Sequence, residues 1–344
     1  MKKLKVAVVG CGLVAQRRHI PAFLRLRDKV SLCSVCDLNF DLAKSVASKF
    51  GVPTAYSDLS AMLSRERPDV VDVCTPPQTH MNVAVKAMEN GCHVLLEKPM
   101  ASSVDDCDKM IKTSEKQGVK LSIVHNQRFY PPFLRAMELV KRGAIGELTG
   151  MKVISLTSKY EYLVHENHWI HKLPGGVIGE TGPHVVYMSL AFVKNVKDVE
   201  VVACKRTTYP WVLYDDYRIV IKGENITSSI TVSHANNYTL SEVELFGVDY
   251  ALRMNLESML LIRYRYSSLK PRNVAISSLS VAGQIIKGVV SNTFKVILGK
   301  PMLGHDIMIE EFVKSVVNDQ QVPVTPQEGR ETVRILEKIV EKLY

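Results

Sequence analysis

Val6-Ala-Val-Val-Gly10-Cys-Gly12-Leu-Val-Ala15 is the stretch that decides the fold of the N-terminal half. Its apolar run predicts a buried strand, and the G-x-G-x-x-A spacing predicts a tight turn into a helix. Gly10 allows the turn, Gly12 lets a pyrophosphate approach the backbone, and Ala15 lets the helix pack closely on the strand. The N–H groups at the start of such a helix bind phosphate. We therefore expect a dinucleotide-binding domain.

A second predicted strand, Val30–Cys36, ends in Asp37. A carboxylate at this position hydrogen-bonds the ribose hydroxyls of NAD and repels the 2′-phosphate of NADP. The expected cofactor is therefore NAD, with NADP disfavoured. The alternative is that Asp37 only begins a turn with Asn39.

The first 125 residues or so alternate short apolar runs with amphipathic segments, a pattern typical of a parallel sheet covered by helices. The predicted strands are Lys5–Val9, Val30–Cys36, Val70–Cys74, His93–Leu96 and Lys120–Val124. From about residue 147, predicted strands follow one another with few helices between them, which favours a mostly antiparallel sheet. The predicted fold class is α/β, with an N-terminal Rossmann domain at 1–124 and an α+β domain at 125–344.

Composition excludes several classes of protein. The chain has 344 residues, 46% hydrophobic and 23% charged, unlike a disordered, collagen-like or coiled-coil chain. The first apolar run ends at Gly10, too short for a secretory signal, and we expect no membrane-spanning helix. The seven cysteines are scattered, as in a reducing compartment. We expect a cytoplasmic protein.

Several motifs resemble those of the glucose–fructose oxidoreductase / inositol dehydrogenase family, known as Gfo/Idh/MocA. They are Ala15-Gln-Arg-Arg-His19-Ile-Pro21-Ala22, Cys74-Thr-Pro-Pro-Gln-Thr-His80, His93-Val-Leu-Leu-Glu97-Lys98-Pro99, Asn126-Gln-Arg128-Phe129 and Gly175-Gly176-Val-Ile-Gly-Glu180-Thr-Gly182-Pro-His184. The resemblance covers nearly the whole chain except about 250–300. It implies a C-terminal domain with an open sheet for substrate binding, oligomers formed through that sheet, and hydride exchange between NAD(P) and a carbon of a sugar, cyclitol or nucleotide-sugar.

Lys98, His184 and Glu180 are the expected catalytic residues. Lys98 follows a predicted strand at its carboxyl end, where open α/β sheets bind ligands, and its ammonium can hold the reacting oxygen. His184 can transfer the hydroxyl proton, because imidazole titrates near neutrality. The alternatives are a solvated lysine and a histidine that only packs in its helix.

The remaining site predictions follow the same motifs. The expected cofactor-binding residues are Gly10, Gly12, Leu13, Val14, Asp37, Thr75, Pro76, His80, Glu97, Lys98 and Asn126. The expected substrate-binding residues are Lys98, Trp169, Glu180, His184 and Tyr187. The family pattern usually has Asp at the positions of Glu180 and Tyr187, so we expect a more specialised substrate than inositol or glucose.

His165, His168 and His171 recur every three residues, which invites a metal interpretation. No carboxylate or cysteine beyond Glu161 or Glu166 completes a ligand set, so we expect a loop lining the substrate pocket and no metal.

Residues 251–300 form a basic insertion, with eight Lys or Arg residues against the single acid Glu257, in a chain of net charge +9. Within it, 273–298 reads as a helix with an apolar stripe. Three interpretations are open: packing on the sheet or on a neighbouring subunit, binding of a substrate diphosphate, and contact with anionic lipid. The long stripe suits burial as well as lipid, so we expect peripheral membrane contact least. No motif indicates nucleic-acid binding.

The leading functional prediction is an NAD-dependent oxidoreductase acting on a sugar, cyclitol or nucleotide-sugar. Two alternatives remain open. One is a regulatory NAD-binding protein without turnover, and the other is a redox-neutral NAD-using glycosidase of the same fold.

Overall fold

The computed structural model describes residues 3–265, 268–299 and 303–344. The chain divides into two compact units. The first contains residues 1–126 and 305–334, and the second contains 127–304 and 335–344. The sequence prediction had grouped 305–334 with the C-terminal domain, whereas the structure packs this segment with the N-terminal residues.

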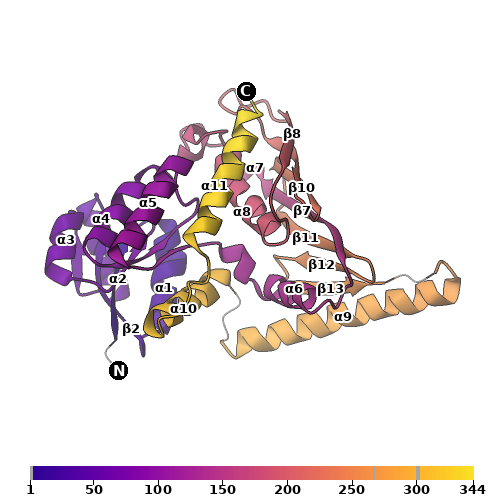
Figure 1. Ribbon diagram of the computed structural model, residues 1–344, viewed down its shortest axis with the longest axis horizontal. Helices are drawn as coiled ribbons and strands as arrows, with labels where there is room; N and C mark the ends of the chain where they lie inside the picture. The colour runs from indigo at the N-terminus through magenta and orange to yellow at the C-terminus, as the bar shows by residue number, and fades with distance from the viewer. Residues whose placement is uncertain (1–2, 266–267, 300–302) are drawn as a thin grey trace. The chain divides into compact units, whose positions relative to one another are not determined.

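The first unit is built on a six-stranded sheet, ordered β3-β2-β1-β4-β5-β6, in which every paired strand is parallel (Figure 1). Its strands are β1 Leu4–Val9, β2 Val30–Cys36, β3 Thr54–Tyr56, β4 Val70–Val73, β5 His93–Leu96 and β6 Leu121–Ile123. This is the strand order of a Rossmann fold, and the order reverses between β1 and β4. The carboxyl ends of all six strands therefore meet at one edge of the sheet.

Helices pack on this sheet through buried apolar side chains such as Phe23, Met62 and Met110. They are α1 Ile20–Arg25, α2 Phe40–Phe50, α3 Leu59–Glu66, α4 Pro77–Glu89, α5 Val104–Gln117 and α10 Gly304–Val317. Local sequence signals define their ends: Asn39 accepts the N–H of Leu42 at the start of α2, and Gly51 ends that helix in the left-handed conformation.

The second unit is built on a seven-stranded mixed sheet, ordered β13-β12-β11-β7-β10-β9-β8. Its strands are β7 Leu148–Ser158, β8 Asp198–Cys204, β9 Asp216–Lys222, β10 Thr227–Asn236, β11 Leu240–Gly247, β12 Ala251–Asn255 and β13 Leu260–Tyr264. Within the described part of the chain, only β7 and β10 of this sheet pair in parallel; the other pairs are antiparallel. Buried and exposed residues alternate along β10, because one face of the sheet carries the core.

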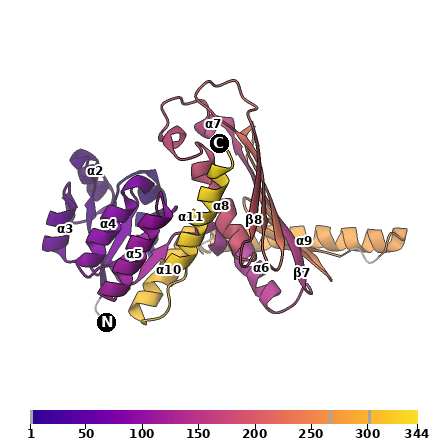
Figure 2. The ribbon, with the colours of Figure 1, turned by 45° about the horizontal axis from the view of Figure 1, so that its top comes forward.

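The helices of the second unit are α6 Pro131–Lys141, α7 Lys159–Tyr162, α8 Ile178–Leu190 and α9 Pro271–Ile297. Helix α8 is almost wholly buried and packs on the sheet with Val153, Ile230 and Val232. Helix α9 lies beside β13 at the edge of the sheet (Figure 1), and Figure 2 shows α9 running outward. Helix α11, Pro326–Glu341, contributes residues to both units.

The predicted Rossmann sheet and the mostly antiparallel second sheet are confirmed. Helix α9 is long and apolar enough to cross a membrane, by length and composition alone, and none of its residues is buried. Its three charged residues are spread over 27 positions. The expectation of no membrane-spanning helix stays a prediction.

Candidate active site

The glycine turn lies directly after β1, at the edge where the strands end. Gly10 has φ +92°, and a Cβ there would lie 2.6 Å from the carbonyl carbon of Cys74, so only glycine fits. A Cβ on Gly12 would meet open space, which leaves room for a ligand to approach the backbone. A π-helical turn, Ala15–His19, then leads into α1. The turn therefore fits the pyrophosphate of a dinucleotide.

Asp37, directly after β2, holds this turn together. Its Oδ2 accepts the N–H of Cys11 at 2.8 Å, and its Oδ1 accepts the N–H of Asn39 at 2.9 Å. The turn between Asp37 and Asn39, the alternative role of Asp37, is thus present. Each carboxylate oxygen of Asp37 can still accept a second hydrogen bond, as binding of a ribose hydroxyl would require.

The segment after β4 contains Thr75, Pro76 and His80. His80 is fully buried, and its ring nitrogens lie 2.8 Å from the Thr75 carbonyl oxygen and 2.9 Å from that of Pro99. It therefore fixes the loop after β4 to the loop after β5. The predicted cofactor residues at the ends of these strands lie along one edge of the sheet.

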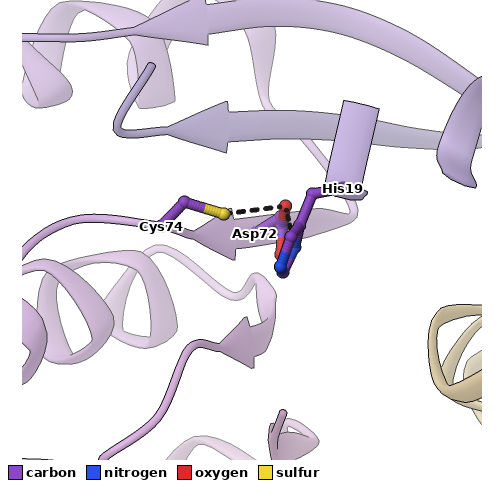
Figure 3. Close-up of side chains that lie close together, drawn as sticks. All are labelled: His19, Asp72 and Cys74. Atoms are coloured by element: carbon purple, nitrogen blue, oxygen red, sulfur yellow. Dashed lines mark hydrogen bonds and ion pairs between the residues drawn. The ribbon is translucent and has the colours of Figure 1, made fainter. Parts of the chain in front are cut away.

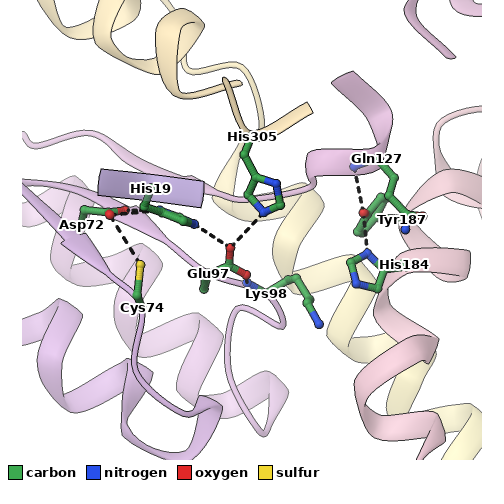
Figure 4. Close-up of polar contacts among 9 residues, drawn as sticks. All are labelled: His19, Asp72, Cys74, Glu97, Lys98, Gln127, His184, Tyr187 and His305. Carbon is green, nitrogen blue, oxygen red and sulfur yellow. Dashed lines mark hydrogen bonds and ion pairs between the residues drawn. The ribbon is translucent and has the colours of Figure 1, made fainter. Parts of the chain in front are cut away.

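Glu97 and Lys98 follow β5 at the same edge (Figure 4). His19 Nε2 lies 2.8 Å from Glu97 Oε1, and His305 Nε2 lies 3.6 Å from the same oxygen. Glu97 Oε2 accepts the backbone N–H of Lys98 at 3.0 Å. Glu97 thus fixes the backbone from which the Lys98 side chain projects.

The other side of His19 contacts a second buried carboxylate. His19 Nδ1 lies 2.9 Å from Asp72 Oδ2 on β4. Burial alone would lower the pKa of His19, but the charge of Asp72 and its hydrogen bond, together with the contact with Cys74, outweigh burial and raise that pKa well above its usual value. Burial alone would raise the pKa of Glu97, but the contacts with His19 and His305 outweigh it and hold that pKa well below its usual value. A protonated His19 between two carboxylates follows.

Two groups of side chains in this unit have the composition of a metal site: His19 with Asp72 and Cys74, and His19 with Glu97 and His305. In Figure 3 the thiol of Cys74 donates to Asp72 Oδ2 at 3.5 Å. Burial raises the pKa of this thiol, so it remains a neutral donor. The contacts within both groups are those of a hydrogen-bond network. The expectation of no metal stays a prediction.

In the second unit, His184 and Tyr187 form a pair on α8 (Figure 4). The Tyr187 hydroxyl lies 2.7 Å from His184 Nδ1 and accepts the backbone N–H of Gln127 at 3.1 Å. Tyr187 is 1% exposed, so its hydroxyl is held in place. A hydroxyl can donate to Nδ1 or accept from it, whereas a carboxylate only accepts. With Nδ1 held by Tyr187, Nε2 of His184 can therefore be unprotonated and act as a base, or protonated and act as an acid.

Glu180 lies in the first turn of α8, four residues before His184 and thus on the same helix face. Burial raises the pKa of Tyr162 and lowers that of His168, and the charge of Glu180 acts to raise the pKa of both. These two side chains lie beside each other, with ring centres 5.6 Å apart. Trp169 is 46% exposed and adjoins His168. Glu180, Trp169 and this aromatic cluster belong to one region of the second unit.

Sequence reasoning missed His234, which lies on β10. The ring is completely buried, and neither ring nitrogen has a hydrogen-bond partner within the described residues. Its ring centre is 6.0 Å from that of Tyr162, beside the same cluster. Burial lowers the pKa of His234 to about 4, so the ring is neutral. A single histidine in a strand has no sequence signature that could have indicated this.

The predicted residues therefore form two groups. Gly10, Gly12, Asp37, Thr75, Glu97 and Lys98 lie at strand ends of the first unit, and Glu180, His184 and Tyr187 lie on one helix of the second. Leu13 is 68% exposed beside the glycine turn, followed by the half-buried Val14, and Asn126 is buried just after β6. Two of the three regularly spaced histidines contact backbone atoms. His168 Nδ1 accepts the N–H of Ile170 at 3.4 Å, and His171 Nε2 lies 3.1 Å from the His165 carbonyl oxygen.

Two family models match most of the chain. The model of the oxidoreductase family with an NAD-binding Rossmann fold matches residues 4–125, and the GFO/IDH/MocA C-terminal domain matches residues 133–253. The chain thus belongs to the Gfo/Idh/MocA family of oxidoreductases, and its N-terminal domain is the NAD-binding domain of that family.

Individual relatives are similar over different lengths. D-glucoside 3-dehydrogenase of Escherichia coli is 35% identical over 145 residues, which span 42% of this chain and 41% of that protein. D-apiose dehydrogenase of Paraburkholderia graminis is 25% identical over 276 residues, 77% of this chain and 71% of that protein. The crystal structure of WlbA dehydrogenase from Bordetella pertussis, in complex with NADH and UDP-GlcNAcA, has a TM-score of 0.81 at 19% identity, covering 99% of this chain and 96% of that one. At that identity the likeness concerns the fold.

Proposed function

We propose that this protein transfers a hydride between NAD and a secondary alcohol or ketone of a sugar, cyclitol or nucleotide-sugar. The observation that carries the proposal is Lys98, fixed by Glu97 at the carboxyl end of β5, on the same sheet edge as the glycine turn and Asp37. Ligands of open α/β sheets bind at this edge, beside the reversal of strand order. Bound NAD would supply the hydride acceptor or donor.

The residues of this chain would supply the proton chemistry and the orientation. The Lys98 ammonium would hold the reacting oxygen and stabilise negative charge developing on it. His184 Nε2 would take the hydroxyl proton during oxidation or return it during reduction, with Tyr187 holding Nδ1. Asp37 would accept hydrogen bonds from ribose hydroxyls, and the segment Thr75, Pro76, His80 together with Asn126 would line the nicotinamide side.

The substrate class rests on two supports. Glu180, Trp169 and His234 offer polar groups and an aromatic ring in one region, a combination suited to hydroxyl-rich rings. Two relatives bear the names of a glucoside and an apiose dehydrogenase, and one structural neighbour contains a nucleotide-sugar. Residence in the cytoplasm and assembly through the second sheet stay predictions.

The test is NADH formation, followed by its absorbance, with a panel of glucosides, free pentoses and UDP-linked uronic acids. Net NADH with one member of the panel, lost in Lys98→Ala, supports the proposal. Cleavage of a glucoside without net NADH would instead support the redox-neutral glycosidase. Tight NAD binding without turnover of any member would support the regulatory alternative.

A further inference from the structure

Helix α9 is exposed along its whole length. It has 27 residues, and at about 1.5 Å per residue it extends roughly 40 Å. None of its residues is buried, and its charged residues are Arg272, Lys287 and Lys295, all of them basic. The helix is therefore long and apolar, but no part of the protein core accounts for its composition.

The side of α9 that contacts the protein is mostly polar, with Val274 and Val281 as its half-buried apolar residues. Gln284 Oε1 accepts the N–H of Arg263 at 2.9 Å, and Gln284 Nε2 donates to the Arg263 carbonyl at 3.0 Å. Asn292 donates to the Met259 carbonyl at 3.0 Å, and Ser277 donates to the Arg265 carbonyl at 3.0 Å. These side chains satisfy backbone groups of the edge strand β13 and its flanks, which would otherwise be unpaired.

Gly288 completes this polar stripe. A Cβ at Gly288 would lie 2.5 Å from Leu260 Cδ2, so the helix backbone approaches β13 closely there. Ser277, Gln284, Gly288 and Asn292 follow one another at the spacing of a single helix face, which also includes the half-buried Val281. A helix on a soluble protein normally turns its apolar face inward. In α9 most of the large apolar side chains instead face away from the protein.

The outward face of α9 carries large apolar side chains over the full length of the helix. Leu279 and Ile297 are each 72% exposed, and Phe294 is 60% exposed. The exposed large apolar side chains of α9 are Ile276, Leu279, Ile285, Ile286, Val289, Val290, Phe294, Val296 and Ile297. A continuous apolar patch of this extent on a soluble protein marks an interaction surface.

The charge around this face indicates what it contacts. Residues 251–300 contain eight basic residues and one acid. Arg263 and Arg265, which adjoin the polar side of α9, are exposed, and their guanidinium groups lie 4.3 and 5.0 Å from the centre of the Tyr250 ring. An apolar face accompanied by Lys, Arg and Tyr is typical of a helix that lies in the interface of an anionic membrane. A second copy of the chain, docked through the same face, would bring two basic clusters together, which is unfavourable.

We propose that α9 docks this protein on the surface of an anionic lipid bilayer. Its outward apolar face would enter the boundary between headgroups and acyl chains, while its basic residues meet the lipid phosphates. The helix would lie on the membrane without crossing it, because Gln284 and Asn292 hold it against β13. This reverses the ranking that the sequence alone favoured, in which lipid contact came last.

Co-sedimentation of the full chain with vesicles tests the proposal. The protein should bind vesicles that contain phosphatidylglycerol at low salt, bind poorly to pure phosphatidylcholine, and dissociate at high salt. Replacing Arg272, Lys287 and Lys295 by Gln should weaken binding roughly fivefold per charge, or about a hundredfold together. Combining Leu279→Gln, Ile286→Gln and Ile297→Gln, which leaves every charge in place, should also abolish binding.

Exposed apolar residues elsewhere in the same unit provide the matched control. Combining Val202→Gln, Leu213→Gln and Val248→Gln should leave vesicle binding unchanged, because these side chains are exposed but lie outside α9. All variants should keep the wild-type melting temperature, since none replaces a buried side chain.

Three results would overturn the proposal. Equal vesicle binding by the apolar α9 variant would show simple charge attraction. No vesicle binding at low salt, with a loss of oligomer in that variant by sedimentation velocity, would assign the face to a second copy. Retention of the wild type on vesicles through both high salt and alkaline extraction would indicate a helix that crosses the membrane.

Discussion

His19 Nε2 and Glu97 Oε1 lie 2.8 Å apart in the interior of the first unit, and both side chains are buried. The other oxygen of Glu97 accepts the backbone N–H of Lys98. One imidazole, from the segment that follows the glycine turn, therefore helps to fix the backbone of the proposed oxygen-binding lysine. On this account His19 and Glu97 are positioning residues for Lys98.

His19→Asn should destabilise the protein by about 3–5 kcal/mol, because it leaves Asp72 and Glu97 as buried carboxylates without their cationic partner. The measurement is the free energy of unfolding in urea. His171→Asn is a suitable control, since His171 is only half-buried and its ring contacts a backbone carbonyl. A loss below about 1 kcal/mol would show that His19 is not a charged partner in this network.

The same pair of variants should show a defined pH dependence. The pKa of His19 is raised on folding, so its stabilising effect is complete below its ordinary pKa of 6.5 and declines as pH rises toward the higher folded value. The pKa of Glu97 is lowered, so its effect is present above 4.5 and is lost as pH falls toward the lower folded value. The difference in unfolding free energy between wild type and His19→Asn should therefore shrink as pH rises above 6.5. A difference that grows over that range would contradict a protonated His19.

Asp37→Ala should weaken NAD binding by about 1.5–3 kcal/mol, because it removes a charged acceptor for the ribose hydroxyls. NADP binding should suffer less or improve. Because Asp37 also accepts the Cys11 N–H, Asp37→Asn serves as a control that keeps an acceptor for the turn. Calorimetry with both nucleotides measures the effect, and a wild type that prefers NADP would refute the role given to Asp37.

Tyr187→Phe should lower kcat by roughly 10- to 100-fold and change KM little, because the ring of His184 would lose the hydroxyl that orients Nδ1. Stability should fall by about 1–3 kcal/mol, since the Gln127 N–H also loses its acceptor. Steady-state kinetics over pH would separate the two effects. An unchanged pH profile with unchanged kcat would show that Tyr187 has only a structural role.

His234→Leu should leave stability unchanged or raise it, because a buried imidazole with two unpaired nitrogens costs about 1–3 kcal/mol. If His234 serves the substrate, KM should rise in the same variant. A stabler protein with normal KM would place His234 outside the substrate region. Thermal unfolding and substrate titration together give the answer.

The Rossmann half was predictable because its signals are local. Gly10, Gly12 and Asp37 follow apolar runs that became β1 and β2, and parallel strands bring such ends to one edge. The short strand β3 and helix α3 were not predicted, since three half-buried residues and a weakly apolar eight-residue helix have little pattern of their own.

Other features depend on contacts that sequence patterns do not encode. His305 reaches Glu97 from a helix more than 200 residues away in the chain. The spacing within α9 predicted an apolar stripe, but only the structure shows that the polar side contacts β13. The role of Tyr187 was half predicted: the sequence indicated a substrate-binding residue, while the hydrogen bond to His184 required the fold.

The most direct test of the proposed chemistry is a single-turnover measurement of NADH formation in Lys98→Ala and His184→Ala, with NAD affinity measured in parallel. Both variants should bind NAD within a few-fold of wild type, because neither side chain is assigned to cofactor affinity alone. The hydride step should slow by roughly 10²–10⁴-fold, as expected when an acid–base or charge-stabilising group is removed. Near-normal turnover in both variants would contradict the account and would leave Glu180 as the next carboxylate to test.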